Sequence, residues 1–320
     1  MNEVEKFPRE VYLIANPTAG RGLGLARLID LENAIRERGI ETHRVLDPDS
    51  RAAIARKLRS ESDAKRRVLV VIGGDGTVNA LVNDGPTAPI CHYASGTENL
   101  FSRAFRTPND PEAMAAWIIE SREANMDLGE FRVESPDGTT PQPKRFALML
   151  GFGFDAAVVN RHHARRVGRA SGTTSRLAYF GPLAHEAWHY DFPAVRMTWT
   201  DDSGQKRTSE GTTAIVFNFD CYALGLKFAP GASPFDGHLD TVRFERRGSI
   251  RAGLYLAMVA SGIHMRLKSV GLDRMREIRL EAVEQPVPVQ MDGDPAGWLE
   301  PGRPWLVRCV PAVCPVLVGP

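Results

Sequence analysis

Apolar and polar residues alternate along the first third of the chain with two different periods. Short apolar runs predict three strands, at 10–17 (EVYLIANP), 40–46 (IETHRVL) and 66–74 (RRVLVVIGG). Amphipathic stretches between them predict two helices, at 24–39 (GLARLIDLENAIRERG) and 49–62 (DSRAAIARKLRSES). Because strands and helices follow one another in turn, this region predicts an α/β domain with a mostly parallel sheet. Such sheets bind their ligands at the carboxyl ends of the strands.

The pattern changes after about residue 124, where short strands separated by proline and glycine turns become the rule. Eight segments predict such strands: 126–134, 145–151, 194–200, 212–219, 238–245, 277–282, 287–294 and 303–310. Two helical stretches interrupt them, near 173–190 and 250–265. We therefore expect an α/β domain over residues 1–124 and a β-rich sandwich domain over residues 125–320.

Composition narrows the function classes. The 320 residues are 43% hydrophobic and 25% charged, as in ordinary soluble proteins. The net charge of +1 gives no argument for a basic surface of the kind that nucleic acids require, so we expect no nucleic-acid partner. The first ten residues do not resemble a signal peptide, and the longest apolar run, 252–263, is too short for a bilayer. These features favour a cytoplasmic protein.

Three glycine turns occur where strands end or pass into helices. They are NPTAGRG at 16–22, GGDGT at 73–77 and the start of YASGTENLFSRAF at 93–105. Backbone N–H groups at a helix amino terminus favour phosphate, and glycine lets the backbone approach it closely. Arg21 adds a cation suited to phosphate oxygens. Asp75 would repel phosphate unless a divalent cation lay between them, so the turns predict a Mg²⁺-nucleotide site.

These residues resemble the diacylglycerol kinase catalytic-domain family of lipid kinases, which includes bacterial diacylglycerol kinases and the sphingosine and ceramide kinases. The resemblance rests on NPTAG, GGDGTVNALVNDG and GTEN in the first domain, and on KFAPGASPFDGHLD and QMDGD in the second. GGDGT alone is shared with NAD kinases, but the set in this order is much more specific. The likeness covers residues 11–311. It implies ATP held by the first domain, and a lipid pocket with acid/base groups in the second.

The resemblance also implies roles for individual residues. Nucleotide contacts would come from the three turns, namely Asn16, Pro17, Thr18, Ala19, Gly20, Arg21, Gly73, Gly74, Asp75, Gly76, Thr77, Val78, Asn79, Thr97 and Asn99. Asp127 would join Asp75 in a hydrated Mg²⁺ network, and Lys227 would meet phosphate charge. The SPFDGHLD segment resembles the family's site for a second, structural Mg²⁺. Its ligands would be the Asp236 side chain and the main chain of Ser233 and His238.

QMDGD matches the family's D-G-E, in which an acidic residue takes the proton from the lipid hydroxyl. Asp292 keeps the first carboxylate and Asp294 stands in place of the glutamate, so we expect Asp294 to be the base, with Asp292 as the alternative. Two further positions depart from the family. Leu100 replaces an aspartate after GTEN, and Ala80 replaces a glutamate.

An ATP-dependent lipid kinase has two rivals. The departures favour a catalytically silent nucleotide- or lipid-binding regulator, and the shared GGDGT favours an NAD kinase. The second-domain motifs argue against NAD kinase. The basic segment 161–170 (RHHARRVGRA) favours peripheral contact with a membrane, or else forms a solvated helix face. The lipid and the oligomeric state, a homodimer included, are left open.

Overall fold

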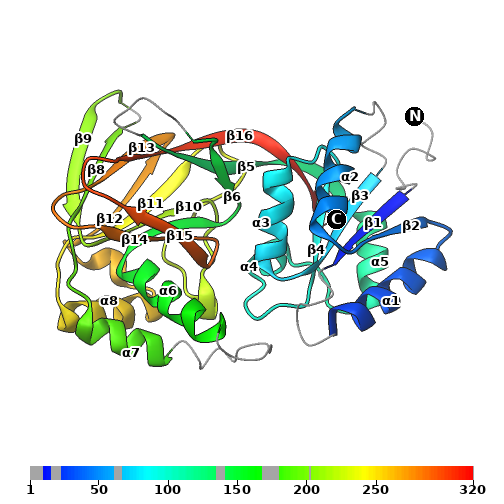
Figure 1. Ribbon diagram of the computed structural model, residues 1–320, viewed down its shortest axis with the longest axis horizontal. Coiled ribbons are helices and arrows are strands. Elements are labelled where there is room, and N and C mark those ends of the chain that lie inside the picture. Colours follow the sequence, from blue (N-terminus) through cyan, green and yellow to red (C-terminus); the bar gives the residue numbers. More distant parts are fainter. Residues whose placement is uncertain are drawn as a thin grey trace. The chain divides into compact units, whose positions relative to one another are not determined.

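The computed structural model describes residues 10–15, 23–60, 67–134, 141–167, 180–201 and 203–319, which divide into two compact units (Figure 1). The α/β unit contains the described residues up to 126 together with 312–319, and the sandwich unit contains those from 127 to 311. The chain passes from the first unit to the second within strand β5 (Arg122–Val133). It returns within strand β16 (Trp305–Val318).

The α/β unit is built on parallel strands in the order β2 (Glu41–Val45), β1 (Glu10–Ala15), β3 (Arg67–Gly73) and β4 (Ile90–Ala94). The end of β16 adds beside β4 through Val316 and Ile90. The three strands and two helices predicted in this region are confirmed, the helices as α1 (Leu23–Arg36) and α2 (Pro48–Ser60).

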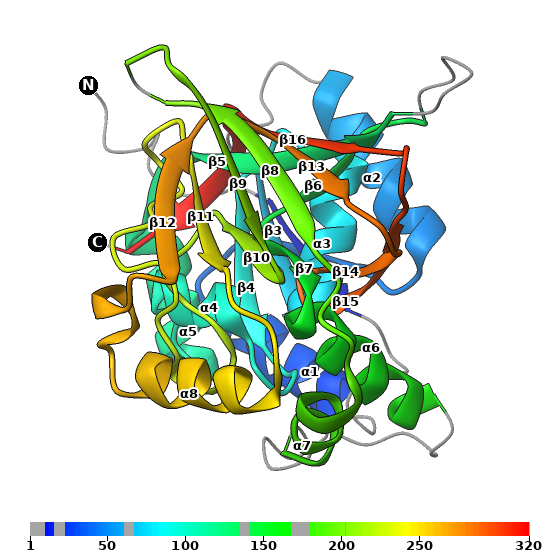
Figure 2. The same ribbon diagram turned by 90° about the vertical axis from the view of Figure 1, so that its left-hand side faces the viewer.

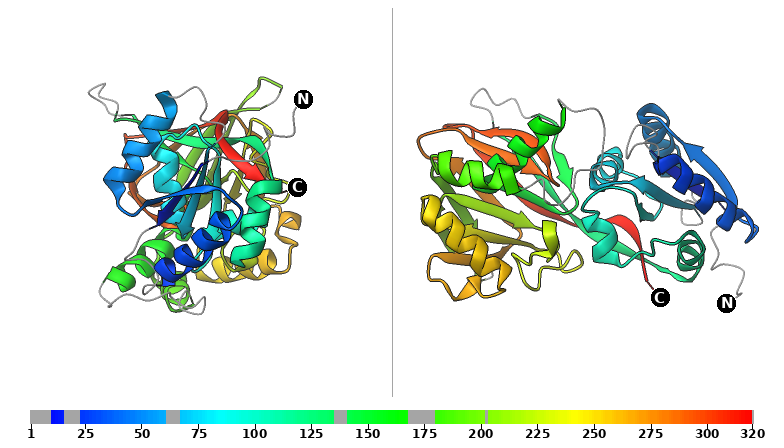
Figure 3. Two further views of the ribbon diagram at one scale, coloured as in Figure 1. Left: turned by 90° about the vertical axis from the view of Figure 1, so that its right-hand side faces the viewer. Right: turned by 90° about the horizontal axis from the view of Figure 1, so that it is seen from below.

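Helices cover this sheet and fix its core (Figure 3). Helix α1 packs against α5 (Pro111–Glu120), and their apolar side chains form one core cluster with alternate residues of β1 and β3. Helix α2 packs against α3 (Asp75–Asp84), and the short helix α4 (Leu100–Phe105) follows β4. The α/β architecture therefore brings the turns after β3 and β4 to the same edge of the sheet.

The sandwich unit contains two sheets. One has the order β12 (Val270–Met275), β11 (Leu239–Phe244), β10 (Thr213–Phe217), β7 (Met149–Gly153), β14 (Val287–Met291) and β15 (Asp294–Leu299). In the other, β16 pairs with β13 (Glu277–Ala282), followed by β8 (Val195–Thr200) and β9 (Lys206–Gly211), while β5 pairs with β16 and β6 (Lys144–Phe146). Apolar side chains from both sheets form the core between them, which confirms the predicted sandwich.

Some elements of this unit differ from the prediction. The strand predicted at 145–151 is two strands, β6 and β7, separated by a bend. Strands β9, β12 and β15 were not predicted, because their polar and mixed sequences, such as KRTSEG in β9, carry little strand signal. They take their conformation from pairing with a neighbouring strand.

Three helices cover the outer face of the six-stranded sheet: α6 (Phe154–Val167), α7 (Phe180–His189) and α8 (Ser249–Ala260). Figures 1 and 2 show them gathered at one end of the unit. The short helix η6 (His264–Arg266) packs against α8, and η5 (Ala223–Gly225) lines the same cavity as α8. Helices α7 and α8 correspond to the stretches predicted near 173–190 and 250–265, with residues 173–179 outside the described residues. The end of α6 forms the helix that was one alternative for the basic segment, whereas its start at 154–160 was not predicted. Among the described residues, no helix has both the length and the apolar character needed to cross a membrane.

Candidate active site

The second and third glycine turns meet at the carboxyl edge of the parallel sheet. Gly73, the last residue of β3, pairs with Ala94 of β4, and the N–H of Ser95 donates to the Gly73 carbonyl over 2.8 Å. A Cβ atom on Gly96 would come within 2.7 Å of the Gly74 Cα, so only glycine lets these backbones approach. The structure thus brings the predicted turns together.

Asp75 links these turns through its side chain. Its carboxylate accepts the N–H of Leu100 over 2.9 Å and the N–H of Phe101 over 3.0 Å, at the start of α4. Asp75 is also the first residue of α3. One carboxylate therefore fixes the amino ends of two helices, and its remaining lone pairs are available to a cation.

Asn99 shapes the third turn from within. Its φ of 51° lies in the left-handed region, which asparagine tolerates better than most residues. Its Oδ1 accepts the Gly96 N–H and its Nδ2 donates to the Gly96 carbonyl, each over 2.9 Å. The side chain is thus used inside the turn, and Asn99 would serve a nucleotide by holding the backbone in place.

The other predicted contacts of these turns differ in what they can offer. The Val78 side chain is buried in the core, so only its backbone could meet a ligand. Thr77 lies against Gly73, where an added Cβ would come within 2.6 Å of the Thr77 hydroxyl. The Asn79 side chain accepts a hydrogen bond from Asn83 over 3.0 Å. Thr97 and Gly76 remain reachable, since the first is partly exposed and the second is exposed.

His92 of β4 holds the second turn through a hydrogen bond to its backbone. This residue was not predicted from the sequence. Its ring is fully buried, and Nε2 lies 2.9 Å from the Gly73 carbonyl, to which it donates. Burial lowers the pKa of His92, and the charge of Asp75 and this hydrogen bond oppose that shift only in part. A neutral imidazole therefore anchors the Gly73 carbonyl. The available signal was a histidine inside an otherwise apolar strand.

The first turn follows β1, whose last residue Ala15 pairs with Ile72 at the same sheet edge. The predicted nucleotide contacts of this turn lie outside the described residues: Asn16, Pro17, Thr18, Ala19, Gly20 and Arg21. Leu100, the departure from the family pattern, is buried as the first residue of α4. There its backbone serves Asp75 while its side chain joins the core.

In the sandwich unit, the QMDGD turn gives its two carboxylates different surroundings. Asp292 has a φ of 49° and is 8% exposed. Its oxygens accept the N–H groups of Ala147, Leu148 and Met149 over 2.8, 2.9 and 2.8 Å. It therefore holds the start of β7 in place, and sequence alone gave no indication of this structural role.

Asp294 follows two residues later and begins β15. Its side chain is 52% exposed, and Oδ1 lies 3.6 Å from Nδ1 of His163 on α6. Asp294 is thus the carboxylate of this turn that a substrate could reach. His163 belongs to the basic segment 161–170, and more than a hundred residues separate it from Asp294, so the sequence does not reveal the pair.

An apolar cavity of about 120 Å³ lies between the six-stranded sheet and the helices. Because side chains alternate along a strand, Thr213 and Ile215 of β10 face it while Ala214 and Val216 enter the sandwich core. Most of the lining is apolar, with contributions from Val158, Leu183, Phe228, Leu256 and Val259. The predicted lipid pocket requires an apolar cavity of this kind, and that a lipid occupies it stays a prediction.

One carboxyl group, Asp155, lines this cavity. It receives hydrogen bonds from the Tyr222 hydroxyl and from Nε2 of Gln290, the latter over 3.0 Å. Burial raises the pKa of Asp155, and these two hydrogen bonds oppose the shift. An added Cβ at Gly151 would come within 2.3 Å of the Asp155 carboxylate, so a glycine makes room for this group.

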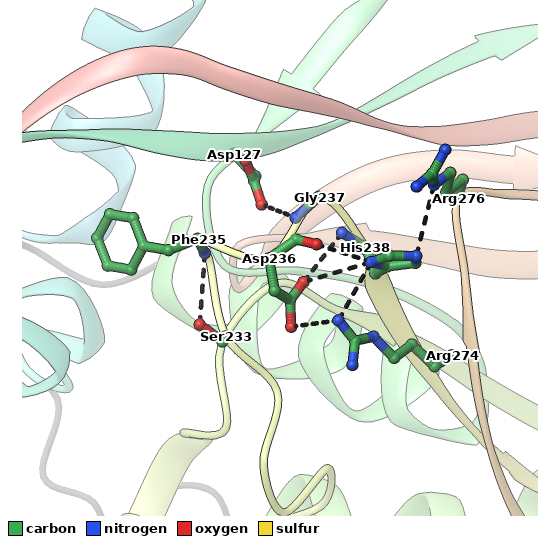
Figure 4. Close-up of polar contacts among 8 residues, drawn as sticks. All are labelled: Asp127, Ser233, Phe235, Asp236, Gly237, His238, Arg274 and Arg276. Atoms are coloured by element: carbon green, nitrogen blue, oxygen red, sulfur yellow. Dashed lines mark hydrogen bonds and ion pairs between the residues drawn. The ribbon is translucent and has the colours of Figure 1, made fainter.

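Asp127 and the SPFDGHLD segment form a connected polar cluster (Figure 4). The Asp127 carboxylate accepts the Gly237 N–H over 2.7 Å, and its own N–H donates to the Pro234 carbonyl over 2.7 Å. Asn218 donates to the Asp127 carbonyl over 2.9 Å. Asp127 therefore ties the segment to β5 in addition to any contact with a hydrated cation.

Asp236 and His238, predicted as ligands of a structural Mg²⁺, are engaged with nitrogen donors (Figure 4). Oδ2 of Asp236 lies 3.0 Å from Nη2 of Arg274, and Oδ1 accepts the His238 N–H over 3.0 Å. Burial and the nearby Asp236 charge raise the pKa of Asp240, and Arg274 opposes this. A guanidinium thus offsets the negative charge of Asp236 in this structure. The second Mg²⁺ site, with main-chain ligands from Ser233 and His238, remains a prediction.

One further prediction concerns a cationic side chain, Lys227. Lys227 is exposed and forms an ion pair with Asp220 over 3.2 Å, so it remains accessible to a phosphate.

Within the described part of the chain, Glu10, Glu41 and His43 group closely enough to hold a metal ion. They lie where β1 and β2 begin, at the edge opposite the glycine turns, and Glu10 already pairs with Arg67 over 2.8 Å.

Comparison with known proteins agrees with this architecture. A family model described as the diacylglycerol kinase catalytic domain matches residues 10–131. A second, described as the YegS C-terminal NAD kinase beta sandwich-like domain, matches residues 149–318.

Individual relatives match nearly end to end. "Putative lipid kinase YtlR" of Bacillus subtilis is 26% identical over 295 residues, covering 89% of this chain and 93% of that protein. "Diacylglycerol kinase" of Staphylococcus carnosus is 25% identical over 301 residues, covering 91% and 90%. The crystal structure of "a putative diacylglycerol kinase from Bacillus anthracis str. Sterne" has a TM-score of 0.72 at 18% identity, covering 100% and 99%, and shares the fold.

Proposed function

The chain belongs to the diacylglycerol kinase catalytic-domain family of lipid kinases, and from this premise we propose its reaction. It transfers the γ-phosphate of ATP, with Mg²⁺, to a hydroxyl group of a membrane lipid of the diacylglycerol or sphingoid type. The observation that carries the choice of a lipid is the apolar cavity of the sandwich unit. Such a surface suits an acyl or alkyl chain, whereas a dinucleotide acceptor would bring polar groups against it.

The nucleotide half of the proposal rests on the α/β unit. The turns after β3 and β4 meet at one sheet edge and are fixed by Asp75, Asn99 and His92. A rigid backbone with glycine at its closest approaches suits polyphosphate, because positioning supplies most of the catalysis in phosphoryl transfer. Mg²⁺ bound with ATP would neutralise the charge on the phosphates, and Asp75 is the carboxylate of these turns suited to meet it.

The proton acceptor in this proposal is Asp294. The lipid hydroxyl oxygen attacks the γ-phosphorus, the bond from that phosphorus to the bridging oxygen of ADP breaks, and Asp294 takes the hydroxyl proton. Exposure of its side chain supports this choice over Asp292, whose oxygens already accept three backbone N–H groups. Asp155 is placed to orient a polar group at the cavity wall.

The test is transfer of radioactive phosphate from γ-labelled ATP, with Mg²⁺, into a mixed lipid extract, followed by mass identification of any labelled lipid. We expect one lipid class to be labelled, and Asp75→Asn to lose the activity. Asp110→Asn is the matched control, because Asp110 also caps a helix of the α/β unit, accepting the Ala113 N–H over 2.9 Å, away from the turns. It should cost similar stability and keep the activity.

Two results would contradict the proposal. Absence of label from several lipid extracts, although ATP binds, would assign the protein to the silent regulators. Label on NAD with none on lipid would make it an NAD kinase.

A further inference from the structure

Helix α8 is apolar on both of its faces. Towards the interior, Tyr255 and Val259 are buried, and Leu256 lines the cavity. Towards solvent, Ile250 is 88% exposed and Leu254 is 39% exposed. These two are four residues apart and so lie on one stripe of the helix. A helix in a water-soluble unit normally places polar residues on its outer face, so this stripe needs another explanation.

The sequence around this stripe is basic. Residues 246–268 contain no aspartate or glutamate and five basic residues, Arg246, Arg247, Arg251, Arg266 and Lys268. The whole chain, by contrast, carries nearly equal numbers of basic and acidic residues, 40 and 39. All five are exposed. The preceding carboxylate, Glu245, is paired with Arg243 over 3.3 Å. The outer face of α8 is therefore both apolar and locally positive.

The same elements also enclose the cavity. Leu224 of η5 lines it and is 39% exposed, and Arg246 lines it at the start of the basic stretch. Helix α7 packs against α8 (Figure 2). It bears Trp188, which is 77% exposed. Exposed apolar groups thus continue from the solvent side of these helices to the wall of the cavity beneath them.

We propose that the outer face of α8, with its flanking cations, docks onto an anionic lipid bilayer. The proposal rests on the proposed function, because a cavity for a lipid chain needs a route from a membrane. Ile250 and Leu254 enter the apolar boundary of the bilayer while the arginines and the lysine meet lipid phosphates. A bilayer is favoured over a protein partner because it alone supplies both the negative charge and the chain that fills the cavity.

This surface is separate from the basic segment considered from sequence. Within that segment Arg161 is paired with Glu186 of α7, and residues 168–170 lie outside the described residues. Both α8 and the segment are basic in sequence, but residues 246–268 around α8 carry five cations and no carboxylate, beside the exposed side chains of Ile250 and Leu254.

The test is cosedimentation of the full-length protein with vesicles, without ATP, so that binding is measured independently of catalysis. Vesicles of phosphatidylcholine are compared with an equal mixture of phosphatidylcholine and phosphatidylglycerol. We expect binding to the mixed vesicles that weakens with salt. Ile250→Ser should lower the partition coefficient about tenfold. Arg251→Glu should lower it by about tenfold or more, since two units of charge are lost.

Matched controls carry the same substitutions elsewhere. Ile29→Ser removes another partly exposed isoleucine from the outer side of α1, and Arg56→Glu changes the net charge equally on α2. Both should bind mixed vesicles like the wild type. Equal binding by the two α8 variants and the wild type would overturn the proposal. So would wild-type binding that does not depend on phosphatidylglycerol, or a dimer that Ile250→Ser disrupts without any change in vesicle binding.

Activity then separates this inference from the proposed function. A short-chain diacylglycerol dissolved as monomers needs no membrane, so Ile250→Ser and Arg251→Glu should phosphorylate it at wild-type rates and fail only on vesicle-borne substrate. If the wild type phosphorylates the soluble substrate but does not bind vesicles, the docking surface is refuted and the kinase stands. If it binds vesicles and phosphorylates no lipid, the kinase is refuted.

Discussion

The two units assemble their functional groups in different ways. In the α/β unit, the turns are contiguous stretches at neighbouring strand ends, and backbone geometry fixes them. In the sandwich unit, groups far apart in sequence meet: Asp155 with Tyr222 and Gln290, and Asp294 with His163. A phosphate needs a rigid array of N–H groups, which a local turn supplies. A lipid needs a hollow, which only elements packed over long sequence distances can form.

Replacing Asp292 should show how strongly the sandwich unit depends on such long-range contacts. In Asp292→Asn the amide keeps one acceptor oxygen and presents an NH₂ group where backbone N–H donors converge. We expect a loss of about 3 kcal/mol of unfolding free energy, measured by urea denaturation. A change below about 0.5 kcal/mol would contradict the structural role of Asp292, because that is the range of neutral surface substitutions.

Filling the cavity should separate lipid binding from nucleotide binding. Ala252→Phe places a ring at a lining position of α8. We expect the KM for a long-chain diacylglycerol in mixed micelles to rise about tenfold, because the ring takes cavity volume that the lipid chain would otherwise fill. The KM for ATP should not change. Ala53→Phe, at an exposed position of α2 in the α/β unit, is the control and should keep both values. Equal effects of both variants would mean that the cavity holds no substrate chain.

Replacing Arg274 should show what holds the SPFDGHLD segment in place. In this structure Arg274 pairs with Asp236, a residue that the family resemblance assigns to a metal site. Arg274→Met should lower unfolding free energy by up to about 1 kcal/mol, because the pair with Asp236 is partly exposed. Without nucleotide, the wild-type Tm should be the same in Mg²⁺ and in EDTA. A rise of several degrees with Mg²⁺ would show that a cation displaces the guanidinium and holds the segment.

The smallest effect is expected at Asp155. Burial raises its pKa, so the folded protein binds this proton more tightly than the unfolded chain does. The carboxyl therefore lowers stability as the pH rises through its folded pKa, and the full cost is present above it. Asp155→Asn should raise the Tm by about 2 °C at mildly alkaline pH. This gain in Tm should shrink as the pH falls towards the ordinary pKa of aspartate. A gain that is independent of pH would show that it does not come from ionisation of Asp155.

Local features could be predicted from the sequence, whereas features that depend on distant partners could not. Strands β1 to β3 and the turn after β3 were readable because glycine, the lone Asp75 and the apolar runs are local signals. The roles of Asp292 and Arg274 were not, because each depends on partners more than thirty residues away. Strand β9 shows the same limit for the fold, since its polar residues become a strand only through pairing with β8. The predicted roles of Asp127 in a hydrated Mg²⁺ network and of Lys227 towards phosphate remain predictions.

The most direct test of the account is the initial rate of phosphate transfer from ATP to the identified lipid by Asp294→Asn, measured beside its melting curve. Asp294 is half exposed, so the variant should keep the wild-type Tm. Loss of a positioned general base should lower kcat by about 10²–10⁴ while ATP binding persists. A wild-type rate would contradict the assignment of Asp294 as the group that takes the proton from the lipid hydroxyl.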